Sequence, residues 1–227
     1  MSPEFNSNDS RRKATPLLYC GVVAGPVFTV VAVIEMMTRS GFDLGRHDLS
    51  LLSNGSLGWI QISNFILAGV LTIAAALGMR RVLRSGRGST WAPILIAIYG
   101  LGYIGAGVFV ADPMNGFPPG TPNGLPGSAS WHSWMHLISG SLGFIALIAA
   151  CFTFARRFSG LRRRGWMAYS LATGIVVLAA VIGISSGSQS AATIIGFFVA
   201  ATVGWAWLSA LSVRLVGRSQ GVGLDHS

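Results

Sequence analysis

The chain has 227 residues, of which 52% are hydrophobic and only 10% are charged. In a soluble domain roughly a quarter of all residues are charged, so this composition excludes an ordinary water-soluble protein. The net charge of +9 does not indicate a nucleic-acid partner, because the basic residues form short clusters between long apolar runs rather than one patch. The length suits a single compact bundle.

Six apolar runs follow one another along the chain, and each is long enough to cross a bilayer. A helix needs roughly 20 residues to cross a hydrocarbon core of about 30 Å. The runs are apolar on every face and lack the alternation of a transmembrane β-strand, so the sequence predicts an all-α bundle of six membrane helices. The predicted spans are Leu17–Met37, Trp59–Met79, Trp91–Ala111, His132–Ala155, Trp166–Ile184 and Ala191–Val213.

The basic residues lie almost entirely on one side of these spans. If the N-terminus is inside, all of the 16 basic residues except Arg39 and Arg46 fall in the inner segments. Cytoplasmic loops are enriched in arginine and lysine, so both termini are predicted to be cytoplasmic. Residues 1–16 and 214–227 are then tails around a transmembrane domain of residues 17–213. We expect a multi-pass protein of a prokaryotic plasma membrane.

Two of the predicted outer loops are long, Thr38–Gly58 and Asp112–Trp131, whereas the third, Ser185–Ser190, is a short turn. The second loop contains five prolines. Because each proline fixes its own φ angle, we expect this loop to be stiff and without regular structure. Loops of this kind either cap a cavity or act as linkers, and the sequence favours neither.

Apart from the two tails, every acidic residue and every histidine falls on the predicted outer side. These residues are Glu35, Asp43, His47, Asp48, Asp112, His132 and His136. The inner side is basic and carries no comparable set of reactive groups. The sequence therefore predicts that a functional site opens outward, between the ends of the first four helices.

A metal site is one interpretation of the histidines. His132 and His136 are four residues apart at the start of a predicted helix, so their rings share a face and can bind one ion from two sides. Asp112 is the natural third ligand and His47 a fourth. A divalent metal such as Zn²⁺ held by His132, His136 and Asp112 would activate water. Alternatively, histidines beside Trp131 only hydrogen-bond headgroups or loop carbonyls.

Metal-free chemistry is the other interpretation of the same side. Glu35 lies near the outer end of the first span, where an ionisable group either snorkels or faces a polar cavity, and it could serve as an acid. Gln61 and Asn64 share one face of the second helix, although hydrogen bonds between helices also explain them. The predicted catalytic residues are Asp112, His132, His136, His47 and Glu35, and the predicted substrate-binding residues are Asp48, Gln61, Asn64 and Trp131.

Three functions are compatible with these residues. The first is an enzyme that acts on a lipidic or isoprenoid-like substrate by metal-assisted or acid–base chemistry. The second is a non-catalytic protein that binds lipids or a small molecule, or an accessory subunit. A transporter is weaker, because the chain shows neither clear repeats nor charges near the membrane midplane. We expect membrane lipids as partners and no nucleic acid, and the sequence leaves the oligomeric state open.

Several motifs on the outer side resemble a known family. The stretches Gly41–Ser53, Gly58–Gln61 and Ala111–Gly120, with Asn64–Phe65, look like the signature of the bacterial and archaeal membrane family called domain of unknown function 998 (DUF998). The resemblance covers roughly residues 17–213. It implies a multi-span membrane protein, often of six helices, and no established activity. No catalytic residue is carried over from it, but its motifs coincide with the polar residues of the outer side.

Overall fold

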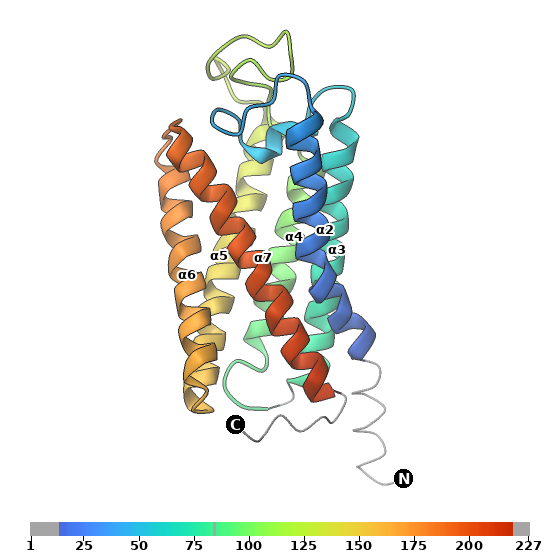
Figure 1. The fold of residues 1–227 in the computed structure, drawn as a ribbon, viewed down its shortest axis with the longest axis vertical. Helices are drawn as coiled ribbons and strands as arrows, with labels where there is room; N and C mark the ends of the chain where they lie inside the picture. The colour runs from blue at the N-terminus through green and yellow to red at the C-terminus, as the bar shows by residue number, and fades with distance from the viewer. Residues whose placement is uncertain (1–13, 84, 220–227) are drawn as a thin grey trace.

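The computed structural model describes residues 14–83 and 85–219, and this part of the chain contains six long helices and no strand. All six are long and apolar enough to cross a membrane, which confirms the predicted six-helix membrane bundle. The helices are α2 (Thr15–Thr38), α3 (Gly58–Val82), α4 (Trp91–Val108), α5 (Trp131–Gly160), α6 (Arg164–Ser185) and α7 (Ala191–Ser219), with a short 3₁₀-helix, η1 (Leu49–Ser53), between α2 and α3 (Figure 1).

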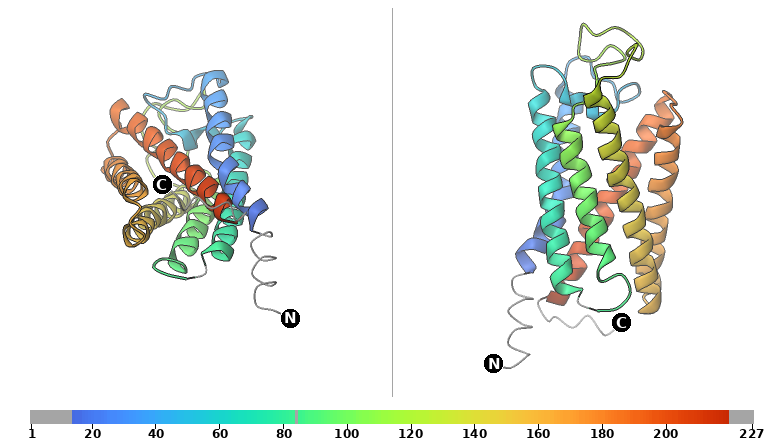
Figure 2. Two further views of the ribbon diagram at one scale, coloured as in Figure 1. Left: turned by 60° about the horizontal axis from the view of Figure 1, so that its bottom comes forward. Right: turned by 180° about the vertical axis from the view of Figure 1, so that it is seen from behind.

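The helices form a closed ring. Each helix packs against the next one in the chain, and α7 crosses back to pack against α2 (Figures 1 and 2). We call the end that carries residues 39–57, 109–130 and 186–190 the loop end, and the opposite end, with residues 83–90 and 161–163, the basic end. That the loop end faces outward stays a prediction. Arg11, Arg12, Lys13 and Arg84, four of the residues behind that prediction, lie outside the described residues, as does most of each predicted tail.

The helix boundaries differ from the predicted spans for local reasons. α4 ends at Val108, three residues before the predicted end, and the backbone of Phe109 after it is extended. Pro113 excludes a much longer helix, because it has no N–H to donate to Phe109 and disfavours helical backbone at Asp112. α5 and α7 instead run on past their apolar runs to Gly160 and Ser219. The added turns carry arginines, whose long aliphatic stems let the charged groups reach water.

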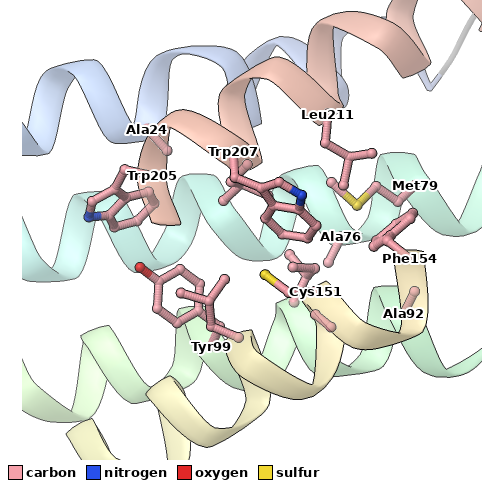
Figure 3. Close-up of a cluster of buried hydrophobic side chains, with 14 of the residues drawn as sticks. Ala24, Ala76, Met79, Ala92, Tyr99, Cys151, Phe154, Trp205, Trp207 and Leu211 are labelled. Atoms are coloured by element: carbon pink, nitrogen blue, oxygen red, sulfur yellow. The ribbon is translucent and has the colours of Figure 1, made fainter. Parts of the chain in front are cut away.

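Aromatic rings fill the centre of the ring of helices (Figure 3). Trp205 of α7 packs against Tyr99 and Tyr103 of α4 and Phe28 of α2, with ring centroids 4.9–5.6 Å apart. Its indole N–H donates to the Tyr103 hydroxyl at 3.1 Å, so the buried polar atom has a partner. Large apolar side chains also cover the outside, Met37 being 81% exposed, as expected of a protein whose solvent is lipid.

Glycines bring α3, α4 and α5 into close contact. A Cβ atom on Gly102 of α4 would lie 2.6 Å from the Cα of Gly143 in α5, and one on Gly69 of α3 would lie 2.5 Å from the carbonyl oxygen of Gly100. Such approaches require glycine, because any side chain would meet backbone. Gly140, also in α5, is different, since a Cβ there would meet nothing within 4 Å.

The two long loops pack on one another at the loop end. Leu51 and Leu52 of η1 form a small apolar cluster with Ala111 and the fully buried Phe117. Asn54 strengthens this contact by donating to the carbonyl of Ala111 at 3.0 Å. The first part of the proline-rich loop therefore rests on the first loop, whereas residues 122–129 are exposed.

Candidate functional site

A cavity of about 280 Å³ lies in the half of the bundle nearest the loop end. α4, α5, α6 and α7 supply most of its wall, and Phe28 of α2 and Phe65 of α3 also line it. Loop residues, among them Leu44, Leu51 and Met114, cover the cavity at the loop end. Apolar side chains dominate the wall, and no arginine or lysine of the described chain contributes to it.

The cavity reaches the outside of the bundle between α5 and α6. These helices lie together near the basic end and separate toward the loop end (Figure 2). Leu137 and Ser141 of α5 and Ser185 of α6 all line the cavity, and all are exposed on the surface, Leu137 by 53%. Both helices are long and apolar enough to cross a membrane.

His136 projects into this cavity from the second turn of α5. Its Nδ1 lies 3.0 Å from the carbonyl oxygen of Ala106 and 2.8 Å from that of Phe109. Ala106 belongs to the last turn of α4 and Phe109 directly follows the helix, and neither carbonyl has a partner within α4. Since carbonyl oxygens only accept, Nδ1 must carry a proton and donate it. In the neutral ring Nε2 is then the acceptor, and no hydrogen bond to Nε2 occurs within residues 14–83 and 85–219.

Asp48 lies beside His136 on the cavity wall, at the residue that precedes η1. Its side chain does not cap η1. Burial raises the pKa of the Asp48 carboxyl above its ordinary value, and the charges of His136 and His47 oppose this shift. Among the predicted site residues, the structure therefore brings Asp48 and His136 together on the wall of one cavity.

Asp112 has a different setting. Its carboxylate accepts hydrogen bonds from the backbone N–H of Ser130 at 2.7 Å and from the Ser130 hydroxyl at 2.6 Å. The same hydroxyl caps α5 by accepting from the N–H of Ser133 at 3.1 Å. Asp112 thus supports the N-terminus of α5, where a negative charge is favourable.

His132 points away from the cavity. Its exposed ring stacks on Trp131, with centroids 3.6 Å apart, and Trp131 in turn contacts Phe109. No group of three or more His, Cys, Asp or Glu side chains in the described part of the chain is arranged to hold a metal ion. The predicted ligands His132, His136 and Asp112 are consequently not brought together as a metal site.

Both ring nitrogens of His47 are already used. Nδ1 accepts from the backbone N–H of Asp43 at 2.9 Å, and Nε2 donates to the carbonyl of Asn115 at 3.0 Å. The ring is buried and packs against Phe42 and Phe117. His47 therefore ties the first loop to the second and has no free nitrogen for the predicted fourth metal bond.

Glu35 forms an ion pair instead of facing the cavity. Its carboxylate lies 3.2 Å from the guanidinium of Arg39, and the two side chains are only 4% and 7% exposed. Arg39 also donates to the carbonyls of Leu52 and Asn54 and lies over the ring of Phe117. The pair thus fastens the end of α2 to both long loops.

Gln61 and Asn64 are buried between α2 and α3. The amide of Asn64 donates to the carbonyl of Phe28 and to the side-chain oxygen of Gln61, each at 3.1 Å. These bonds correspond to the helix–helix role that was the alternative to substrate binding. Neither residue lines the cavity.

The comparisons with known proteins point to one family. Residues 22–214 match the family described as "Protein of unknown function (DUF998)". The chain belongs to this family. No curated protein and no solved structure matches the chain. The membership confirms the resemblance and a multi-span membrane protein.

Sequence reasoning missed the aromatic residues of the cavity in this DUF998 protein. Phe65, Tyr103, Phe144 and Trp205 line it, and they come from four different helices. In the sequence each is one more apolar residue within a membrane span. Aromatic residues in the loop-end half of several spans were the only available signal, and that signal does not separate a cavity wall from a packed core.

The cap of α5 gives a first prediction. Replacing Ser130 by alanine should lower the free energy of unfolding by about 1 kcal/mol, because the N–H of Ser133 and the Asp112 carboxylate both lose a partner. SDS-induced unfolding in mixed micelles measures the change. Ser128→Ala is the control, since Ser128 is exposed and makes no hydrogen bond in the described part of the chain. Equal stabilities for the two variants would contradict the capping role.

Proposed function

We propose that this protein binds an amphiphilic small molecule from the membrane in the cavity near the loop end. The apolar wall would surround the apolar part of the molecule, and Asp48, Ser133 and His136 would meet its polar end. The proposal is supported by the general character of ligand pockets, which are mostly apolar with a few polar groups that fix orientation. The observation that carries it is that Asp48 and His136 both lie on the wall of one mostly apolar cavity.

Selectivity for such a ligand would have to come from its polar end. A molecule already dissolved in lipid gains little from apolar burial, because hydrocarbon chains are as apolar as the cavity wall. A hydrogen bond or charge pair that replaces contact with hydrocarbon is worth more there than in water. Asp48 and His136 are the groups that can supply it.

An acid–base enzyme is the second candidate, and one observation favours it. With Nδ1 held by the carbonyls of Ala106 and Phe109, the Nε2 atom of neutral His136 is a proton acceptor on the cavity wall. Asp48, with its raised pKa, would be the complementary proton donor. Turnover of a bound lipid that His136→Gln abolishes without loss of binding would distinguish the enzyme from a binding protein.

Contact quenching of tryptophan fluorescence tests the binding proposal. Trp205 lines the cavity, and bromine quenches tryptophan on contact. Three ω-bromodecyl probes, an alcohol, a carboxylate and a trimethylammonium, would be titrated into the protein in dodecyl maltoside micelles. We expect at least one probe to quench saturably, and Trp205→Phe to remove that component.

A variant with a filled cavity tests whether the probes bind in the cavity itself. A Cβ atom at Gly140 would meet no neighbour within 4 Å and Gly140 lines the cavity, so the ring in Gly140→Phe should occupy cavity space and weaken binding by at least ~10-fold. Gly196→Phe is the matched control, because Gly196 is equally unhindered but faces outward on α7. The proposal fails if no probe quenches saturably, or if Gly140→Phe binds every probe as the parent does.

A further inference from the structure

The carboxylate of Asp48 has no direct partner in the described chain. Within residues 14–83 and 85–219 no hydrogen bond or ion pair reaches its side chain, although it is half-buried and lines the cavity. A carboxylate removed from water without a partner is unfavourable. A ligand that supplies a positive charge or a donor at this point would relieve that cost.

No arginine or lysine of the described chain lines the cavity, so neither residue type supplies this charge. The arginines nearest in sequence, Arg39 and Arg46, are engaged elsewhere. Arg39 pairs with Glu35, and Arg46 reaches the second loop, where it donates to Asn115 and Asn123. His136 lines the same cavity as Asp48, but its Nδ1 proton already goes to the carbonyls of Ala106 and Phe109, and no hydrogen bond joins the two side chains in the described residues.

Aromatic rings continue the wall from this carboxylate into the cavity. Phe65 packs edge-to-face against His136, with centroids 6.3 Å apart, and Tyr103 lies next to Phe65 at 5.6 Å. Phe144 and Trp205 follow, both in contact with Tyr103. The faces of aromatic rings attract cations, most strongly where water is excluded. An anionic group would instead meet the carboxylate of Asp48.

We infer that the ligand is a lipophilic amine or quaternary ammonium compound, whose cationic group lies at Asp48 and whose apolar part lies along the aromatic wall. This inference rests on the proposed function and adds the chemical class of the ligand. It assigns Asp48 as the residue that determines specificity. The neutral tautomer of His136 is compatible with a cation beside it.

The three ω-bromodecyl probes test this assignment, because they share one chain and differ only in the polar end. We expect the trimethylammonium probe to bind the parent protein at least ~10-fold more tightly than the alcohol or the carboxylate. In Asp48→Asn the advantage of the cation should disappear, with its affinity falling about 10–100-fold while that of the alcohol changes little.

Two controls accompany the charge-removing variant. Asp43→Asn removes a carboxylate from the same loop, but Asp43 is exposed and outside the cavity, so it should bind like the parent. Because Asp48→Asn removes an unpaired charge, its thermal midpoint should not fall, and this measurement excludes misfolding as the cause of weaker binding.

The outcomes separate this inference from the proposed function. If the alcohol or the carboxylate binds as tightly as the cation, or if Asp48→Asn keeps the preference for the cation, the amine assignment is overturned. Saturable quenching that Gly140→Phe weakens would in that case still support a binding cavity. Absence of saturable quenching by all three probes would overturn both.

Discussion

Replacing Arg39 by methionine is expected to lower the free energy of unfolding by about 3–5 kcal/mol, the cost of leaving a buried charge without its partner. Glu35 would lose its only ion-pair partner in the described chain, and the carbonyls of Leu52 and Asn54 would lose a donor. The end of α2 would also separate from the loops that cover the cavity. SDS-induced unfolding in mixed micelles, together with limited proteolysis of the loops, measures both effects.

Two further variants serve as controls for this prediction, a substitution of a second arginine and a double substitution. Arg46→Met removes an exposed arginine from the same loop, whose hydrogen bonds of 3.3–3.4 Å are long, so it should change stability by no more than about 0.5 kcal/mol. Adding Glu35→Gln to Arg39→Met should recover part of the loss, since no unpaired charge then remains. If Arg39→Met and Arg46→Met are equally stable, the ion pair does not hold the loops.

Replacing Gly102 by alanine is the second change with a large expected effect. The new Cβ would lie 2.6 Å from the Cα of Gly143 and 2.7 Å from the carbonyl oxygen of Ser139, both backbone atoms of α5. Backbone cannot move aside as a flexible side chain can, so α4 and α5 must separate. Overpacking of this kind costs about 1–3 kcal/mol and occasionally more.

The matched control for Gly102→Ala lies on the facing helix. Gly140→Ala adds the same methyl group where it meets nothing within 4 Å, so its stability should stay close to that of the parent. Both variants would be compared by the SDS concentration at half unfolding. A Gly102→Ala protein as stable as Gly140→Ala would show that the two helices are not in close contact at this level of the membrane.

The six helices could be predicted from the sequence because each one makes its own backbone hydrogen bonds. A long apolar run in lipid must bond its backbone internally, and this holds for α2 or α6 whatever the neighbours do. Boundaries were less predictable where local chemistry intervenes. α4 ends short of its apolar run and Pro113 prevents it from continuing past Asp112, whereas the arginines near Gly160 let α5 continue into the headgroup region.

The two histidines of α5 show that spacing in the sequence does not by itself predict which side chains act together. His132 and His136 are four residues apart on one helix, and the spacing predicted that they would act together. His136 lies level with the last turn of α4 and donates to its free carbonyls. His132, one turn further toward the loop end, lies beyond the end of α4 and stacks on Trp131. The end of a neighbouring helix, and not the spacing, decides their different roles.

The amino-acid sequence by itself determined that this is a six-helix membrane protein of the DUF998 family whose acidic and histidine side chains, apart from those of the two tails, gather at one end. Those properties depend on composition and local hydrogen bonding. Only the tertiary structure decided which polar side chains share a cavity. Asp48 meets His136 because a loop folds back over the ring of helices, while Glu35, His47 and Asp112 are used to hold the loops and helix ends in place.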